Sequence, residues 1–282
     1  MGSIAEFVAL LDVTEVGPGR FAGESDAGER RVVDGSQVLA QSIVAAAKAL
    51  PGRSIRSARS TFMRTIAAEL PLDFEVDVIR AGRRLAFADV HCRQGDRECV
   101  RTTVLLDHPE PDVIRHESPA PPSAGPEAAV ECVMPMPGRE LRLDGIEDVN
   151  SPDEVGPPTI QAWLRYDDPP ERDELAKALL AHFTGHLSIS ATMRAHPGIG
   201  TADSHATVST APLVISIAFH EPVGWTGWLR YDHDSTFVGA GSAYVRGRIF
   251  GDGDRLLASF AQEAMLRPLD EHELAITEAA RL

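Results

Sequence analysis

With 282 residues, the chain is long enough to bury a substantial core in one or two domains. Its hydrophobic fraction of 43% and its charged fraction of 24% are those of an ordinary globular protein. The net charge of −15 argues against broad binding to nucleic acid or to anionic membranes, because both require a basic surface. We therefore expect neither of them as a partner.

The cysteines and the N-terminus bear on location. Cys92, Cys99 and Cys132 are odd in number and lack metal-ligand spacing, so we expect reduced thiols in a cytoplasmic protein. The N-terminus lacks the basic region of a signal peptide, and no apolar run is long enough to span a bilayer.

The first half of the chain predicts one helix followed by strands. GSQVLAQSIVAAAKAL (Gly35–Leu50) is rich in alanine, carries apolar residues close to helical spacing and ends before Pro51 and Gly52. Four strand-like runs come next: SIRSARSTFM, DFEVDVIRAG, RRLAFADVHC and ECVRTTVLL. The turns RAGRR and RQGDR separate the last three, which is typical of an antiparallel meander.

A proline-rich stretch from His108 to Glu140 lies between the halves. It has neither a helical nor a strand period, which predicts a linker without regular structure that crosses a surface.

The second half repeats the order of the first. PPERDELAKALLAHFTGHLSISATM begins with prolines and acids and carries residues at helical spacing. It precedes the strand-like runs ATVSTAPLVISIAFH, GWTGWLRYDHDS, AGSAYVRGRIF and RLLASFAQEAML. Because no βαβ alternation is present, the pattern predicts a duplicated α+β unit with antiparallel strands.

An amide interrupts the last strand-like run. Gln262 stands where the strand should be sheltered, and a buried amide needs hydrogen-bond partners or a functional role. Aligning Gly95-Asp96-Arg97 with Gly253-Asp254-Arg255 puts Gln262 opposite Val104, so the first half keeps an apolar residue there. This asymmetry favours a site built in one half only. A glutamine bonded to a neighbouring loop is the structural alternative.

Two further motifs stand at helix ends. In VDGSQ, Gly35 allows close backbone approach, the helix N-terminus offers N–H groups to an oxyanion or a phosphate, and Ser36 is the expected N-cap. His182 and His186 share the spacing of the metal pair in H-E-x-x-H. Because Phe183 replaces the glutamate and no third ligand is evident, we expect no metal.

The order of these motifs resembles a known family. FAGESDAGERRVVDGSQVLAQSIVAAAKAL followed by SARSTFMR resembles the opening of acyl-CoA thioesterase II, the TesB-like family. LLAHFTGHLSI, AFHEPV, STFVGAGSAYVRGRIF and LLASFAQEAMLR resemble its second half, so the likeness covers nearly the whole chain except the linker. It implies an α+β double hotdog, in which each of two repeats is a long helix wrapped by an antiparallel sheet. We predict an N-terminal hotdog over residues 1–108, a proline-rich linker over 109–157 and a C-terminal hotdog over 158–282.

The resemblance implies hydrolysis of fatty acyl-CoA to a fatty acid and coenzyme A, without a cofactor. Family members activate a water with an Asp on the second-half helix, a Thr or Ser on the next strand and a Gln on the last strand. Gln262 matches that Gln. Gly185 stands in place of the Asp, and Pro212 takes the Thr or Ser position, with Thr210 a short shift away.

The missing Asp requires another base, because an amide can orient a water but cannot accept its proton. His186, next to Gly185, and His182, one turn earlier, titrate near neutrality and are candidates. Packing of the helix is the alternative role for both. We thus predict Gln262, Thr210 and His186 as catalytic residues.

For substrate binding we predict Gly35 and Ser36 as oxyanion donors, and Arg59 and Arg64 as contacts to the phosphates of coenzyme A, since arginine suits phosphate. Strand arginines on a solvated face are the alternative. We expect acyl-CoA as the partner and a homo-oligomer of two or four chains. Two other functions stay open: an acyl-CoA binding protein that has lost its base, and a hotdog hydratase or dehydratase, whose D-x4-H spacing is not evident here.

Overall fold

The computed structural model describes residues 3–26, 32–134, 136 and 138–269. The outer bounds of the two predicted halves, residues 1 and 282, lie outside this part of the chain. Its α-helices are α1 (Ile4–Leu11), α2 (Gly35–Ala49), α3 (Asp173–Phe183) and α4 (Ser188–Met193). Its strands are β1 (Thr14–Gly17), β2 (Arg20–Gly23), β3 (Ser54–Phe62), β4 (Leu72–Ala81), β5 (Leu85–Gln94), β6 (Arg97–Asp107), β7 (Val130–Glu131), β8 (Arg139–Leu143), β9 (Thr159–Tyr166), β10 (Val208–Phe219), β11 (Leu229–Gly239), β12 (Ser242–Phe250) and β13 (Leu256–Pro268).

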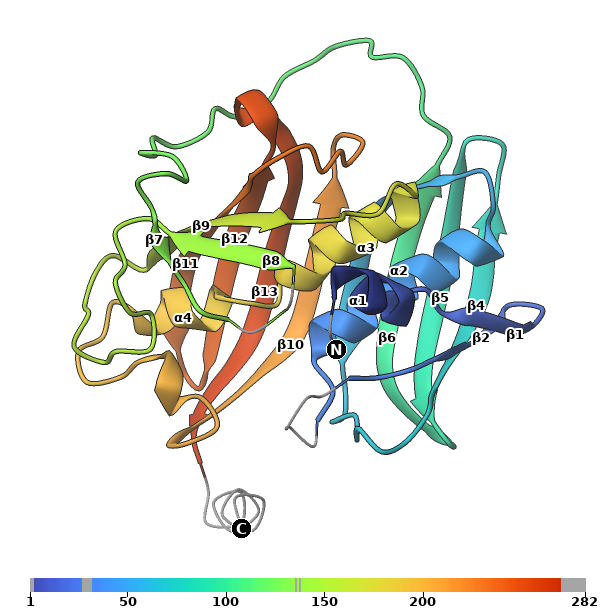
Figure 1. Cartoon of the computed structure of the whole chain (residues 1–282). Helices are drawn as coiled ribbons and strands as arrows, with labels where there is room; N and C mark the ends of the chain where they lie inside the picture. Colours follow the sequence, from blue (N-terminus) through green and yellow to red (C-terminus); the bar gives the residue numbers. More distant parts are fainter. Residues whose placement is uncertain (1–2, 27–31, 135, 137, 270–282) are drawn as a thin grey trace.

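All the named strands belong to one sheet, in the order β1-β2-β4-β5-β6-β3-β10-β13-β12-β11-β9-β8-β7. Every pairing between neighbours is antiparallel. The order β4-β5-β6-β3 is mirrored by β11-β12-β13-β10, and β3 pairs with β10 at the seam between the halves. The predicted duplication of a helix followed by an antiparallel meander is therefore confirmed, and with it the α+β double hotdog (Figure 1).

Helices α2 and α3 pack against each other on one face of this sheet (Figure 1). Asp34 is the N-cap of α2, and its side chain accepts a hydrogen bond from the Ser36 N–H at 2.8 Å. The expectation that Ser36 is the N-cap is thus wrong by two residues: the acidic side chain before Gly35 satisfies the first turn. Because α3 covers one side of α2 and the sheet covers the other, almost the whole helix is buried.

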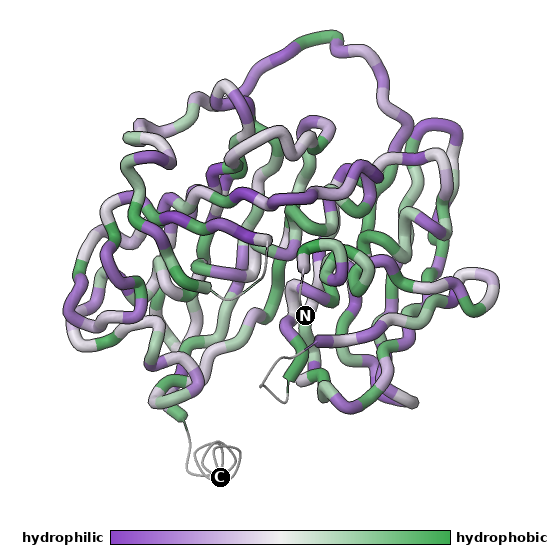
Figure 2. The backbone as a smooth tube through the Cα atoms, in the orientation of Figure 1, coloured by the Kyte–Doolittle hydropathy of each residue, from purple (hydrophilic) through white to green (hydrophobic). Residues whose placement is uncertain are grey.

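The strands alternate between an inner face toward the helices and an outer face toward solvent. In β3, for example, Ala58 and Ser60 are buried, whereas Arg59 and Thr61 are exposed. This period of two appears as alternating hydrophobic and hydrophilic colour along the strands in Figure 2. The alternation decides which side chains can reach a site beneath the helices.

Two segments differ from the expectation. The stretch expected to lack regular structure contains β7 and β8, which continue the sheet beyond β9 because Leu141 and Leu143 are buried against the core. The long helix expected in the second half is also broken into α3 and α4. The division of the chain at 108 and 158 stays a prediction.

Within the described residues, no helix is both long and apolar enough to cross a membrane.

Candidate functional site

The N-terminus of α2 meets the end of α3 and the centre of the sheet. A Cβ atom at Gly185 would lie 2.7 Å from the Ser36 Cβ and 3.5 Å from a methyl group of Ile215. Ile215 of β10 is paired with Gln262 of β13, and the side chains of directly paired residues point to the same face of a sheet. The structure therefore brings Gly185, the start of α2 and Gln262 into one region of the inner face.

Gln262 is fully buried on this inner face. Neither its amide nitrogen nor its amide oxygen has a hydrogen-bond partner among the described residues. The structural alternative, a hydrogen bond from Gln262 to a neighbouring loop, is not observed among the described residues. Burial of an amide without such a partner costs about 1–3 kcal/mol. An amide kept in the core at such a cost is typical of a group that serves a ligand or a reacting water.

Pro212 of β10 pairs with Ala264 of β13, which is two residues from Gln262 and therefore on the same face of the sheet. A Cβ atom at Gly35 would be 3.2 Å from the Pro212 Cγ and 2.8 Å from the Phe62 Cε1. The position that the resemblance assigns to Thr or Ser thus does face the start of α2. Because proline has no hydroxyl, it cannot hold a water there.

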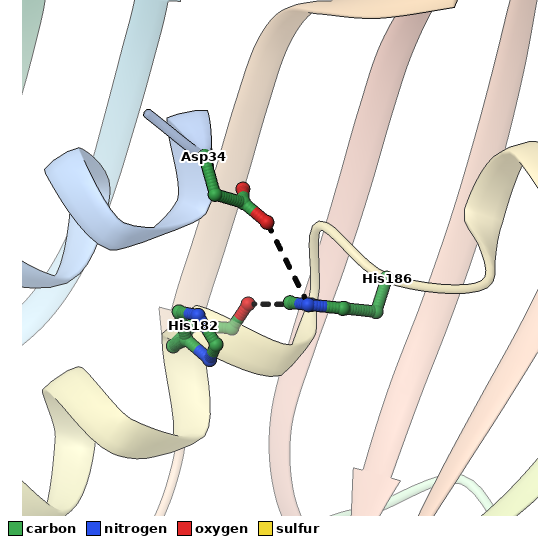
Figure 3. Close-up of side chains that lie close together, drawn as sticks. All are labelled: Asp34, His182 and His186. Atoms are coloured by element: carbon green, nitrogen blue, oxygen red, sulfur yellow. Dashed lines mark hydrogen bonds and ion pairs between the residues drawn. The ribbon is translucent and has the colours of Figure 1, made fainter. Parts of the chain in front are cut away.

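A carboxylate reaches the region from α2 instead (Figure 3). The Oδ2 atom of Asp34 lies 3.6 Å from the Nε2 atom of His186, and the two side chains are 25% and 17% exposed. The Nδ1 atom of His186 is 3.2 Å from the backbone oxygen of His182. Since a carbonyl can only accept, Nδ1 carries a hydrogen, and Nε2, the ring nitrogen that can gain or lose a proton, faces Asp34.

The charges of this pair support each other. Burial alone would raise the pKa of the Asp34 carboxyl, but the charges of His186 and His182 and the hydrogen bonds from Ser36 outweigh it and lower the pKa to about 2. Asp34 is therefore ionised at neutral pH. Both donors of Ser36, its N–H and its hydroxyl at 2.7 Å, are directed at Asp34 and not outward.

The backbone around His186 is unusual. Leu187, the next residue, has a φ of 62°, a left-handed conformation that is uncommon for any residue except glycine. The turn ends α3, and the rings of His186 and Phe183 stack within 5.3 Å. The imidazole is thus held by a strained turn on one side and by an aromatic ring on the other.

His182 joins the same cluster. Its ring lies 4.8 Å from that of His186, and one ligand atom from each of Asp34, His182 and His186 falls within 4.8 Å of the others. The expectation that a third potential metal ligand is lacking is therefore wrong, because Asp34 comes from the other half of the chain. Its signal in the sequence was an Asp immediately before the Gly-Ser start of a helix, a usual N-cap position.

Three predicted site residues do not join this region. Thr210 pairs with Leu266, four residues from Gln262 along β13, or about 13 Å at the usual strand rise. Its hydroxyl lies 3.4 Å from the Nε2 of His205. Arg59 is on the outer face in an ion pair with Glu263 at 3.5 Å, and Arg64 is exposed and donates to the backbone oxygen of Glu98.

Solved structures share the fold of this chain. The tesB protein of Mycobacterium avium subsp. paratuberculosis superposes with a TM-score of 0.80 at 22% identity, covering 94% of this chain and 100% of that one. The acyl-CoA thioesterase II of Mycobacterium marinum gives a TM-score of 0.76 at 22% identity, covering 94% and 98%. A protein of Alicyclobacillus acidocaldarius described as having a hot dog fold also superposes with a TM-score of 0.74 at 18% identity, covering 94% of this chain and 99% of that one, which agrees with the double hotdog architecture.

The sequence itself matches two family profiles: the acyl-CoA thioesterase N-terminal domain over residues 25–106 and the C-terminal domain over residues 115–266. Acyl-CoA thioesterase 2 of Haemophilus influenzae is 24% identical over 281 residues, covering 92% of this chain and 96% of the relative. The chain belongs to the acyl-CoA thioesterase family. Acyl-CoA hydrolysis is thereby supported over the binding-protein and hydratase alternatives.

Proposed function

We propose that the protein hydrolyses fatty acyl-CoA with the pair formed by His186 and Asp34 in place of the family's missing carboxylate. The observation that carries this proposal is the approach of Asp34 Oδ2 to His186 Nε2, beside Gly185. The carboxylate absent from position 185 is supplied by the other half of the chain, two residues before the Ser36 that contacts Gly185.

In the proposed reaction, Gln262 orients a water and the Nε2 atom of His186 takes its proton. The hydroxide attacks the thioester carbon, and the backbone at Gly35 stabilises the oxyanion at the helix N-terminus. The carbon–sulfur bond then breaks, and the thiolate of coenzyme A receives the proton from His186. Asp34 stays ionised and stabilises the imidazolium, which is a partner for both the carboxylate and the His182 carbonyl.

Thr210, Arg59 and Arg64 have weaker support. The Thr210 hydroxyl lies beside His205, Arg59 is paired with Glu263, and Arg64 donates to the backbone oxygen of Glu98. We keep Arg59 and Arg64 in the proposal as contacts to the phosphates of coenzyme A, because their side chains are exposed.

A cytoplasmic homo-oligomer of two or four chains remains part of the proposal. The cytoplasmic location is supported by three free thiols, of which those of Cys92 and Cys99 are buried. Size-exclusion chromatography with light scattering tests the assembly directly.

Thiol release from acyl-CoA, followed with a thiol-reactive dye, tests the function. We expect wild-type turnover and a loss of roughly 10²- to 10⁴-fold in His186→Gln, the usual contribution of a general base. His220→Gln is the matched control, since His220 directly follows β10, is exposed and is hydrogen-bonded to Ser259. Absence of turnover in the wild type with every acyl length would refute the proposal.

A chelator separates this chemistry from a metal-dependent one. In the proposed reaction Asp34 and His186 act without a metal ion, so prolonged treatment with EDTA should leave the rate unchanged. Loss of activity with EDTA and its return with Zn²⁺ would make the same three side chains a metal site instead.

A further inference from the structure

The seam between the two halves ends beside the start of α2. β3 and β10 pair from Ser57↔Ala218 to Thr61↔Val214, and the pairing stops there. β3 continues by one residue, Phe62, which still pairs with β6. In β10 the register shifts between Pro212 and Val214, so that an extra residue bulges out of the ladder.

Pro212 keeps this end of the seam from closing by backbone pairing. It pairs with Ala264 of β13 on one side, but it has no N–H to donate to a further strand. Beyond Val214, the contact between the halves therefore depends on side chains.

Two apolar side chains cover the helix start at this point. The Phe62 ring and the Pro212 ring both approach Gly35, at 2.8 Å and 3.2 Å from where its Cβ would be. Phe62 is only partly buried. Beside it in the chain, Met63 is 44% exposed, and beside Pro212, Leu213 is 39% exposed.

We propose that Phe62 is the gate and the length selector for the acyl group, which enters at this end of the seam. This inference rests on the proposed hydrolysis and deepens it. A thioester carbonyl that meets Gly35 lies beside Phe62 and Pro212, because these two side chains lie against the start of α2. An acyl chain is apolar, and the exposed side chains of Met63 and Leu213 offer it an apolar path from solvent.

The length dependence follows from the volume of the ring. A phenyl ring occupies the space of several methylene groups, so its removal lets a longer chain bury more of its surface. Each additional buried methylene is worth about a three- to fourfold gain in kcat/KM. A larger ring at the same position should shift the preference toward short chains.

The test compares kcat/KM for acetyl-, octanoyl- and palmitoyl-CoA in the wild type, Phe62→Ala and Phe62→Trp. We expect Phe62→Ala to raise the ratio of palmitoyl to acetyl turnover by at least about tenfold, and Phe62→Trp to lower it. Phe237→Ala is the matched control, because Phe237 is a 56% exposed phenylalanine beside a bulge in β11. It should leave the ratio unchanged.

An unchanged ratio in both Phe62 variants, each with wild-type circular dichroism, would overturn the gate while leaving the hydrolase intact. Calorimetry of the same three acyl-CoA esters measures their binding affinities, and so the effect of Phe62 on chain length, without requiring turnover. If the wild type binds but does not hydrolyse them, the proposed function fails, and a shift of binding preference in Phe62→Ala still decides the gate. Identical binding preferences in all variants would refute it.

Discussion

Replacing Gln262 with leucine should make the protein more stable and nearly inactive. The side chain is fully buried, and neither amide atom has a hydrogen-bond partner within the described part of the chain. Leucine has a similar volume and leaves no polar atom unsatisfied, so Gln262→Leu should gain about 1–3 kcal/mol in the free energy of unfolding. Loss of the group that orients the water should lower kcat roughly 10²-fold.

The matched control is Gln41→Leu in α2. Gln41 is equally buried, but its amide nitrogen donates to the backbone oxygens of Leu10 at 3.0 Å and Glu24 at 2.7 Å. The same substitution there removes both hydrogen bonds, and only the Glu24 oxygen keeps another donor, the Gln37 amide at 3.1 Å, so the change should cost about 1–3 kcal/mol.

Urea unfolding gives the stability of both variants, and thiol release gives their activity. Opposite signs of the two stability changes are the expected result. If Gln262→Leu destabilises the protein as much as Gln41→Leu does, Gln262 is a structural residue. If Gln262→Leu keeps full activity, the site has been placed wrongly.

Two further predictions concern Gly185 and Asp232. Gly185→Asp should not restore a family-like site but should lower the free energy of unfolding by about 2–4 kcal/mol, because its Cβ would lie 2.7 Å from that of Ser36 and would displace the α2 cap. Adding Ser36→Gly should recover part of the loss, and Gly224→Asp, in open space, is the neutral control. A Gly185→Asp variant that is fully stable and more active would contradict this packing. Burial raises the pKa of the Asp232 carboxyl to about 6 despite Arg230 and Arg248, so the folded state should lose stability as the pH rises from about 4 to 6. Asp232→Asn should lack that loss, and melting temperatures that fall equally in both proteins over this range would refute the assignment.

The repeated architecture was readable from the sequence because it depends on local patterns. The helix expected at Gly35–Leu50 is observed as α2, Gly35–Ala49, and the meanders of both halves appear as β4–β6 and β11–β13. Each of these elements carries its own period and its own turn residues. The short strands β7 and β8 were missed because they form only by adding to the edge at β9, which local sequence does not reveal.

The candidate site was only partly readable, for a related reason. Gln262 was visible as an amide that breaks the pattern of a buried strand. The approach of Asp34 to His186 was not, since it joins the first turn of α2 to the residues just after α3 across the two halves. Thr210 was favoured by its hydroxyl, but the register of β10 against β13 carries it away from Gln262.

The claim that Asp34 and His186 act as one unit is tested most directly by a double-mutant cycle on thioester hydrolysis. Asp34→Asn, His186→Gln and the double variant are compared with the wild type in kcat/KM at about pH 7.5, where the Asp34 carboxyl, with its pKa lowered to about 2, is ionised. If the carboxylate acts through the imidazole, the double variant should be about as slow as His186→Gln alone. Losses that multiply, or an Asp34→Asn variant with wild-type kcat/KM, would contradict the account.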